Sequence, residues 1–334
     1  MSVTRRRRKP PAFTTVFRQI NTSLNSEKGI NSMSKQPRDE TVGFIGLGMM
    51  GQPMATNIMK KGHRLVAYDV ASGALDKIAS LGAKAATGPA DVARQANVVI
   101  SMVDTTAQAE EVIVGKGGVI DGAQAGDVIV SMSTIDPVML RAMHATLAAK
   151  GIGLIDAPVS GMVKGAIAGT LKASVGGDAN ALEKARPVLE AMSSEIVHFG
   201  PIGQGTVMKL INNLLSQVTG VVVAEALVLG TKAGLDPTQM VQSILKSTGN
   251  SVAFEYAAPR ILERNFEGIR MDIVDKDLEL QVQLAKSLKV PLFMTNLAHQ
   301  VYQMARSEGL GSEDYAASIV KVYERITGVT VKGH

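Results

Sequence analysis

The 334-residue sequence contains no cysteine. This absence excludes disulfides, thiol nucleophiles and thiolate metal sites, and it leaves the cellular compartment undetermined. Tryptophan is absent too, and aromatic residues make up 4% of the chain, so the core must be built from Val, Ile, Leu, Ala and Met. The few histidines do not have the spacing of metal ligands, and no metal site is expected; they are His63, His144, His198, His299 and His334.

The net charge of +5 comes from one end of the chain. Residues 1–40 hold nine basic and three acidic side chains, which leaves 26 basic and 27 acidic groups in the remainder. The body therefore has no positive surplus for binding a nucleic acid. The longest apolar stretch, Val218 to Gly230, is shorter than a membrane span of about 20 residues and contains Glu225. Neither a nucleic acid nor a membrane is expected as a partner.

Residues 1–40 are polar and rich in arginine, and they contain no apolar segment of the kind a secretory signal needs. Two interpretations stay open. The tail resembles an organellar transit peptide, which would place the protein in mitochondria. Alternatively, translation begins at Met33, the upstream residues are disordered or not native, and the protein is cytoplasmic.

Residues 41–69 contain the most informative pattern. The apolar run Val42–Ile45 leads into Gly46-Leu47-Gly48-Met49-Met50-Gly51, an amphipathic segment follows, and a second apolar run, Leu65–Tyr68, ends on Asp69. This order of strand, G-x-G-x-x-G, helix, strand and acid is the dinucleotide-binding fingerprint. The three glycines respectively permit the tight turn, the approach of the pyrophosphate and the close packing of the helix, whose N-terminal N–H groups face the phosphates.

Asp69 indicates which dinucleotide binds. It lies 18 residues after Gly51 and would accept hydrogen bonds from a ribose diol, whereas its charge repels a 2′-phosphate. The next four residues contain no arginine, so the sequence favours NAD over NADP. If Asp69 instead caps the following helix, the choice of cofactor stays open.

The α/β alternation continues beyond Asp69 and predicts a Rossmann domain with a doubly wound sheet over residues 41–202. Further strands are expected at Asn97–Val103, Val128–Met132, Ile152–Ile155, Thr170–Val175 and Ile196–Phe199, with helices at Ala74–Ser80, Ala107–Val112, Met139–Lys150 and Ala179–Met192.

From Gly205 onward the sequence predicts no strand. A long helix, Thr206–Thr231, joins the Rossmann domain to an all-α domain over residues 203–330. This helix is apolar around most of its circumference, so other helices or a second subunit must bury it, and a homodimer or homotetramer is expected. Later helices are expected from Asp236, as N-cap, and at Asp275–Leu288, Pro291–Ser307 and Glu313–Thr327.

Four segments carry candidate site residues: Ser131–Thr134, Asp156–Gly161, Gly203–Asn213 and Asp275–Leu278. Lys209 and Asn213 are four residues apart, so they share one helix face among apolar neighbours. A lysine on a buried helix needs a partner or a function, and desolvation lowers its pKa, which suits proton transfer. Structural alternatives stay open for every segment: a helix cap at Ser133 or Thr134, a plain glycine-rich turn, a lysine that reaches solvent, and an ion pair at a helix start.

The order and spacing of these motifs resemble the β-hydroxyacid dehydrogenase family, especially 3-hydroxyisobutyrate dehydrogenases and 2-hydroxy-3-oxopropionate (tartronate semialdehyde) reductases. The resemblance covers residues 41–330 and rests on GFIGLGMMGQPMATNI, SMSTIDP, DAPVSG with GAIAGTL, GQGTVMKLINN and KDLEL. Two residues depart from the family pattern. Met162 stands where a second glycine is usual, and Ser131 stands where an aspartate is frequent.

The resemblance implies a role for each matching residue. Lys209 would be the general acid/base and Asn213 would orient the substrate hydroxyl, while Ser160 and Gly161 would bind a small carboxylate substrate. Thr134 would lie beside the nicotinamide, and Lys276 would lie near the cofactor in the closed site. Met162 would crowd the carboxylate pocket, and Lys164 would either add a charge there or face solvent.

The expected activity is that of an NAD-dependent 3-hydroxyisobutyrate dehydrogenase-like enzyme. Two alternatives remain: a tartronate semialdehyde or related short aldehyde-acid reductase, and a non-catalytic NAD-binding module.

Overall fold

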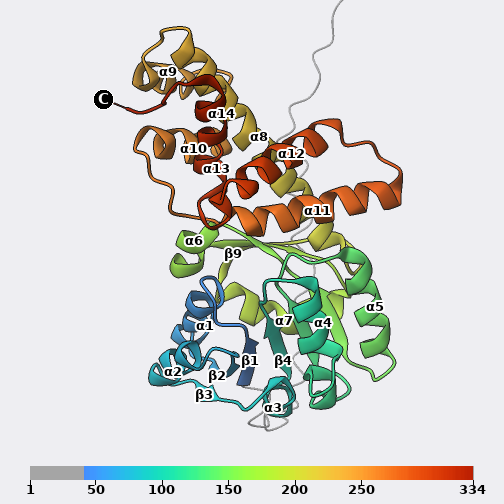
Figure 1. Cartoon of the computed structure of the whole chain (residues 1–334). Coiled ribbons are helices and arrows are strands. Elements are labelled where there is room, and N and C mark those ends of the chain that lie inside the picture. Colours follow the sequence, from blue (N-terminus) through green and yellow to red (C-terminus); the bar gives the residue numbers. More distant parts are fainter. Residues whose placement is uncertain (1–40, 334) are drawn as a thin grey trace, which may run out of the picture. The chain divides into compact units, whose positions relative to one another are not determined.

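A computed structural model describes residues 41–333 of the chain (Figure 1). Both interpretations of the N-terminal tail, including a start at Met33, concern residues that lie outside this range.

The first part of the fold is built on a six-stranded sheet in which every strand pair is parallel. The strand order is β3-β2-β1-β4-β5-β6, which is that of a doubly wound nucleotide-binding fold. The strands are β1 Thr41–Ile45, β2 Arg64–Tyr68, β3 Lys84–Ala85, β4 Val98–Ser101, β5 Val128–Ser131 and β6 Gly153–Asp156.

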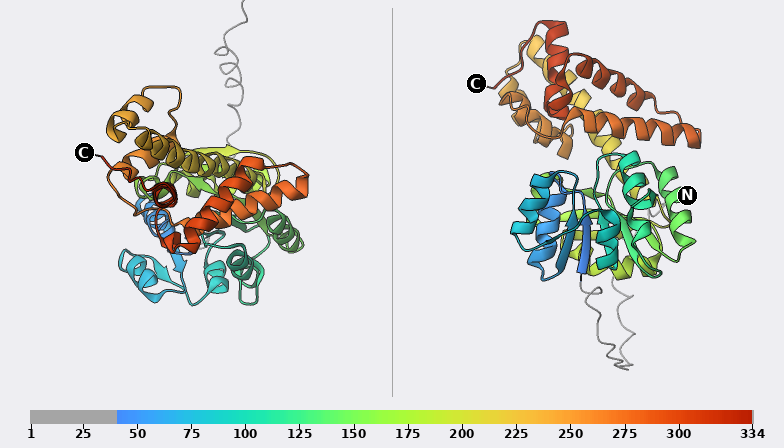
Figure 2. Two further views of the ribbon diagram at one scale, coloured as in Figure 1. Left: turned by 45° about the horizontal axis from the view of Figure 1, so that its top comes forward. Right: turned by 60° about the horizontal axis from the view of Figure 1, so that its bottom comes forward.

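Helices cover both faces of this sheet, as Figure 2 shows. Successive side chains of a strand point to opposite faces, so Phe44 of β1 joins one buried cluster and Ile45 joins the other. Because both faces are covered, the strands are continuous apolar runs. Helices α1 Gly51–Lys60, α2 Ser72–Ser80 and α7 Ala179–Glu190 pack on the first face; α3 Pro89–Gln95, α4 Thr106–Val114 and α5 Pro137–Ala148 pack on the second.

A second, three-stranded sheet follows the first and has the order β7-β8-β9. Its strands are β7 Val159–Ser160, β8 Leu171–Val175 and β9 Ser193–His198. The two later strands predicted from the sequence are confirmed as elements, but they do not extend the main sheet. The segment after Asp156, which also allowed a plain glycine-rich turn, contains β7 and the short helix α6 Met162–Ala168.

The second part of the fold is helical and contains no named strand within residues 203–333, as predicted. Its central element is α8, Gln204–Lys232, a helix of 29 residues. Around it lie α9 Pro237–Ile244, α10 Val252–Leu262, α11 Met271–Leu288, α12 Phe293–Ser307, α13 Tyr315–Ser318 and α14 Val320–Thr327. The sequence had not predicted α10, and the single helix expected from Glu313 is divided into α13 and α14.

By length and composition alone, α8 is apolar enough to cross a membrane. The apolar helix is thus longer than the stretch from Val218 to Gly230 that the sequence indicated. Helices α10, α11, α12, α13 and α14 all pack against α8 (Figure 1), and its buried side chains join the core of the helical part. These are the contacts of a core helix, which passes the same test of length and hydropathy.

The first turn of α8 packs directly on the backbone at the end of β8. A Cβ atom on Gly205 would lie 2.2 Å from the carbonyl oxygen of Ser174. Only glycine lets the helix approach this closely, and the approach fixes the direction in which α8 leaves the sheet.

We expect Gly205→Ala to lower the free energy of unfolding by about 1–3 kcal/mol, because the added methyl group meets main-chain atoms that must shift. Gly73→Ala is the matched control. It is also the second residue of its helix, but no described atom lies within 4 Å of its Cβ position. Thermal unfolding of both variants checks the prediction, and equal midpoints for the two would contradict it.

Candidate active site

The glycine loop lies at the carboxyl end of β1, where doubly wound folds bind ligands. Gly46 has φ +95°, and a Cβ there would lie 2.1 Å from the carbonyl oxygen of Met102. A Cβ on Gly51 would lie 1.9 Å from the carbonyl oxygen of Gly46. Gly48 is exposed, and no described atom lies within 4 Å of its Cβ position. Two glycines are therefore required by packing, and the third leaves open space for a ligand to approach the backbone.

Helix α1 begins at this loop without a side-chain cap among the described residues. Its N-cap residue is Met50, whose side chain offers no acceptor for the first-turn N–H groups. Leu47 is buried beneath the loop, while Met49 is exposed. An uncapped helix N-terminus beside an open glycine is suited to a phosphate group, so these residues fit the dinucleotide that the fingerprint implies.

Asp69 directly follows β2 and lies beside the same loop. Its carboxylate accepts hydrogen bonds from the backbone N–H of Leu47 at 2.5 Å and of Ala71 at 2.7 Å. The N-cap of α2 is Ala71, so Asp69 is not the helix cap that the alternative interpretation required. The carboxylate instead ties the glycine loop to the end of β2. It also borders a cavity of 450 Å³.

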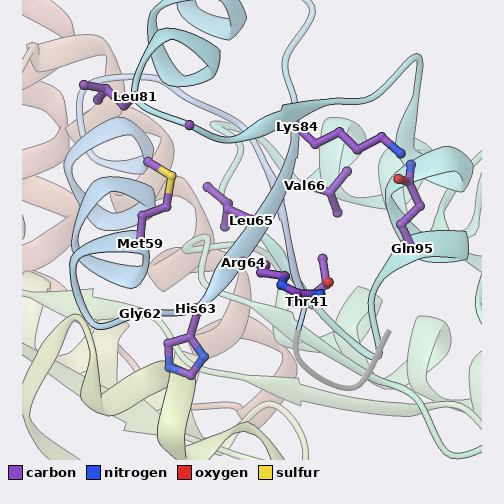
Figure 3. A pocket seen from close by; sticks show the side chains of 11 residues that line it. Thr41, Met59, Gly62, His63, Arg64, Leu65, Val66, Leu81, Lys84 and Gln95 are labelled. Atoms are coloured by element: carbon purple, nitrogen blue, oxygen red, sulfur yellow. The ribbon is translucent and has the colours of Figure 1, made fainter. Parts of the chain in front are cut away.

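This cavity extends from the glycine loop toward α4. Its lining residues are Ile45, Gly46, Gly48, Tyr68, Asp69, Val70, Pro89, Met102, Val103, Asp104, Gln108, Glu111, Val112, Lys116, Gly117 and Gly118. A larger cavity of 680 Å³ lies at the amino ends of β1 and β2, lined by Thr41, His63 and Arg64 among others (Figure 3). Ligands of this fold bind beyond the carboxyl ends of the strands, which is the position of the smaller cavity.

Lys209 meets Ser160 across the two parts of the fold. Its Nζ donates a hydrogen bond to Ser160 Oγ at 3.2 Å. Burial lowers the pKa of Lys209 from its ordinary 10.5, the negative charge of Asp277 raises it, and the positive charge of Lys276 lowers it. Lys209 is half-buried, and its amine faces Ser160 rather than extending into bulk solvent, which argues against the alternative of a lysine that reaches solvent.

Asn213 lies one turn after Lys209 on α8 and faces α11. Its Nδ2 donates to Asp277 Oδ2 at 2.8 Å, and the other carboxylate oxygen of Asp277 lies 3.1 Å from Lys276 Nζ. Lys276 also donates to the main-chain oxygen of Thr134 at 2.5 Å. Polar side chains of α8 and α11 are thus linked to the loop after β5. The ion pair is not at a helix start, because α11 begins at Met271.

Neither Ser133 nor Thr134 caps the next helix. The cap of α5 is Asp136, whose carboxylate accepts from the N–H of Val138 at 2.8 Å. Ser133 Oγ accepts from the N–H of Val103 at 2.9 Å and thereby joins the loops that follow β4 and β5. Among residues 41–333 no group of three or more His, Asp and Glu side chains is placed to hold a metal ion.

Asp156 lies in one of the candidate segments, but the sequence did not reveal its role at the start of α8. Asp156 ends β6, is fully buried, and accepts from the N–H groups of Gly203 and Thr206 at 2.6 Å each. It thus caps α8 from a different element. Burial raises the pKa of Asp156, while the two backbone hydrogen bonds lower it. The signal in the sequence was an acid at the end of a buried strand, which is typical both of a ligand contact and of such a cap.

Two family models match the chain. The NAD-binding domain of 6-phosphogluconate dehydrogenase matches residues 41–200, and the NAD-binding domain of NADP-dependent 3-hydroxyisobutyrate dehydrogenase matches residues 203–323. The chain belongs to the β-hydroxyacid dehydrogenase family. It is therefore a nicotinamide-dependent oxidoreductase that acts on CH–OH groups.

Similar proteins within and around this family have different substrates in their names. The chain is 41% identical to 2-(hydroxymethyl)glutarate dehydrogenase of Eubacterium barkeri, over 87% of this chain and 97% of the relative. It is 34% identical to a mitochondrial 3-hydroxyisobutyrate dehydrogenase of Mus musculus, over 83% and 85%. The solved 3-hydroxyisobutyrate dehydrogenase of Mycobacterium tuberculosis with L-serine is 31% identical, with a TM-score of 0.77 and coverage of 85% and 99%.

The departure from the family pattern at Met162 has a structural consequence. Met162 has φ +55°, in the left-handed region, directly after Gly161 with φ +126°. Glycine adopts this conformation without steric cost, whereas a residue with a Cβ is strained. The strain lies two residues from Ser160, in the turn that presents its hydroxyl. Lys164, in the same short helix, is exposed.

We expect Met162→Gly to be more stable than Met162→Ala by about 1 kcal/mol, because alanine keeps the Cβ that is strained at positive φ and glycine does not. Both variants remove the long side chain, so the comparison isolates the backbone. Denaturant unfolding measures the difference. A Met162→Ala variant as stable as Met162→Gly would show that the turn is not strained.

Proposed function

We propose that the protein oxidises a short 3-hydroxy acid to the corresponding aldehyde acid, as 3-hydroxyisobutyrate dehydrogenases do, and that it uses NAD. The observation that carries the proposal is the contact between Lys209 Nζ and Ser160 Oγ, with Asn213 one turn away on the same helix. These groups can receive a hydroxyl and a carboxylate next to each other.

The role proposed for each residue follows from the contacts that it makes in the structure. Ser160 Oγ and the backbone at Gly161 would hold the substrate carboxylate. The amine of Lys209, when neutral, takes the substrate's hydroxyl proton during oxidation and returns it during reduction. Asn213 donates one amide hydrogen to Asp277, so its second amide hydrogen can be donated to the hydroxyl oxygen of the substrate. When bound, the nicotinamide supplies the acceptor or donor of the hydride.

We propose the following cofactor contacts. The pyrophosphate would lie against Gly46, Gly48 and Gly51 and the N–H groups from Gly48 to Met50, while the N–H of Leu47 stays bonded to Asp69. Thr134 would lie beside the nicotinamide, Lys276 would lie near the cofactor in the closed site, and Asp69 would face the adenine ribose. The charge of Asp69 supports NAD rather than NADP, although one matching family model is named for an NADP-dependent enzyme. The domain boundary near residue 203 belongs to this proposal as well.

The substrate is proposed from the chemistry shared by the relatives. 3-Hydroxyisobutyrate, 2-(hydroxymethyl)glutarate and L-serine all carry a primary hydroxyl on the carbon next to the one that bears the carboxylate. The product of tartronate semialdehyde reduction, D-glycerate, shares this arrangement. The four acids differ in the substituent on the central carbon, so the pocket around it must discriminate among them.

We expect 3-hydroxyisobutyrate to have the highest kcat/KM of these four acids, with NAD preferred over NADP. Lys209→Ala should lower kcat by about 100-fold or more, because general acid/base help is lost. Absorbance of the reduced cofactor measures both. Preference for D-glycerate would favour the aldehyde-acid reductase, and near-normal turnover by Lys209→Ala would refute the proposed mechanism.

The pH dependence of kcat/KM for oxidation should depend on the charges that surround Lys209. Oxidation needs the neutral amine, so kcat/KM for the alcohol should rise with pH through the lowered pKa of Lys209, below the ordinary 10.5. Asp277→Asn removes a charge that raises this pKa and should move the rise to lower pH. Lys276→Met removes a charge that lowers it and should move the rise to higher pH. Shifts in the same direction for both variants would contradict this assignment.

We further infer that the protein forms a homodimer or homotetramer through α8. Its exposed apolar residues Ile211, Leu215, Val222 and Leu229 are four or seven residues apart, so they form one stripe. Leu215 is 64% and Leu229 72% exposed, which is unusual for large apolar side chains on one helix face. A second copy of the chain would bury this stripe.

We expect Leu215→Glu to lower the mass measured by light scattering after gel filtration to that of the monomer, because the new charge cannot be buried. Leu81→Glu is the control, since Leu81 is also an exposed leucine but follows α2 in the first part of the fold. A monomeric wild-type protein at micromolar concentration would exclude the assembly.

As to location, we propose a soluble enzyme of the cytoplasm, or of mitochondria if residues 1–32 direct it there. Mass spectrometry of the native N-terminus decides, because a start at Met33 leaves no transit peptide.

A further inference from the structure

Two buried amides lie between α8 and α11, one turn beyond the proposed catalytic residues. Gln217 and Gln281 are each 3% exposed, and Gln281 Nε2 donates to Gln217 Oε1 at 2.7 Å. Most buried side chains around them are apolar, including Val221, Val274 and Leu278. Buried amides in an apolar interface are expensive to desolvate, so their presence calls for an explanation.

The pair repeats the contact made by Asn213 and Asp277. Gln217 follows Asn213 by four residues on α8, and Gln281 follows Asp277 by four residues on α11. The two contacts therefore lie one helical turn apart along the interface between α8 and α11, which run in the same direction. Asn213–Asp277 is the first contact and Gln217–Gln281 is the second contact. The first contact belongs to the proposed active site, while the second contact is buried and touches none of the residues assigned to substrate or cofactor.

These two contacts define the position of α11 along the axis of α8. If α11 slipped by one turn in one direction, the i+4 spacing would place Gln217 opposite Ala285. A slip in the other direction would place Gln281 opposite Val221. Either slip leaves one buried amide against an apolar side chain, and an unsatisfied buried amide disfavours that arrangement. Buried polar pairs specify helix register in this way in coiled coils.

Two further observations concern the surroundings of Gln217 and Gln281. The hydroxyl of the fully buried Tyr302, on α12, donates to the main-chain oxygen of Gln217 at 3.0 Å. The Oε1 of Gln281 has no hydrogen-bond partner among the described residues. The third helix thus holds the backbone of α8 at Gln217, and the contact between the two amides is retained although one of its atoms is unpaired.

We propose that Gln217 and Gln281 are positioning residues that fix the register of α11 on α8, so that Asp277 holds the amide of Asn213 in the orientation used by the substrate. This inference rests on the proposed function, in which Asn213 contacts the substrate hydroxyl. The two glutamines act through Asn213 and touch no reacting atom.

The test replaces both amides together, by Gln217→Met with Gln281→Met. Methionine has a similar length, and removal of both partners leaves neither amide unsatisfied. The contact of Tyr302 survives, because it uses the main chain. Gln283→Met is the matched control, since Gln283 lies on the same helix but is exposed.

We expect the double variant to keep the thermal midpoint of the wild type and the KM for NAD, while kcat falls about tenfold, because small misplacements of substrate-orienting groups are costly. Gln281→Met alone should also lower the midpoint, since Gln217 then lacks its partner. Gln283→Met should change neither quantity. A double variant with wild-type kcat would overturn the proposal.

A second comparison separates positioning from general structural damage. In an Asn213→Ala background the double replacement should cause no further loss of kcat, because the group that it positions is already absent. The same tenfold loss in that background would overturn the proposal.

A crystal structure of the double variant gives a readout that does not need activity. The bond from Asn213 Nδ2 to Asp277 Oδ2, now 2.8 Å, should lengthen or break. If it stays unchanged, the inference fails even when the enzyme is active. If the wild type oxidises none of the tested acids, the proposed function fails, and this structure alone still decides the role of the two glutamines.

Discussion

The partly desolvated amine of Lys209 is the constraint on which the proposed active site depends. An ammonium group loses most of its hydration when it is buried, and the protein compensates only partly, through the hydroxyl of Ser160 and the charge of Asp277. The incomplete compensation makes the amine easier to deprotonate. A group that must alternate between proton donor and acceptor benefits from this property, whereas a structural lysine would gain nothing from it.

The rest of the fold serves to place that amine. Asp156 caps α8 from the end of β6, and Gly205 lets the helix lie directly on β8, so the first turn of α8 is fixed to the strands. Lys209 follows within the second turn. On the opposite side, Lys276 reaches from α11 to the main chain of Thr134, which brings the helical part to the loop beside the proposed nicotinamide position. The geometry of the proposed active site is thus determined where the two parts of the fold meet.

Much of this arrangement could be predicted from the sequence, because it follows from local pattern. The glycine loop, the parallel strands and the shared face of Lys209 and Asn213 depend on residues that are close together in the chain. The cap at Asp156, the contact between Asn213 and Asp277 and the separate three-stranded sheet depend on residues distant in sequence, so periodicity could not reveal them. The short helix α6 was missed because Gly161 and Gly165 resemble turn residues, and the strain at Met162 became visible only with its φ angle.

The most direct test of the account is a titration of Lys209 by NMR in protein labelled at the lysine side chains, with Lys209→Met to assign its signal. The account predicts that Lys209 titrates below the other lysines and below the ordinary value of 10.5. A Lys209 signal that titrates with those of the exposed lysines would contradict the central claim, because the amine would then be hydrated and charged at the pH where the enzyme works.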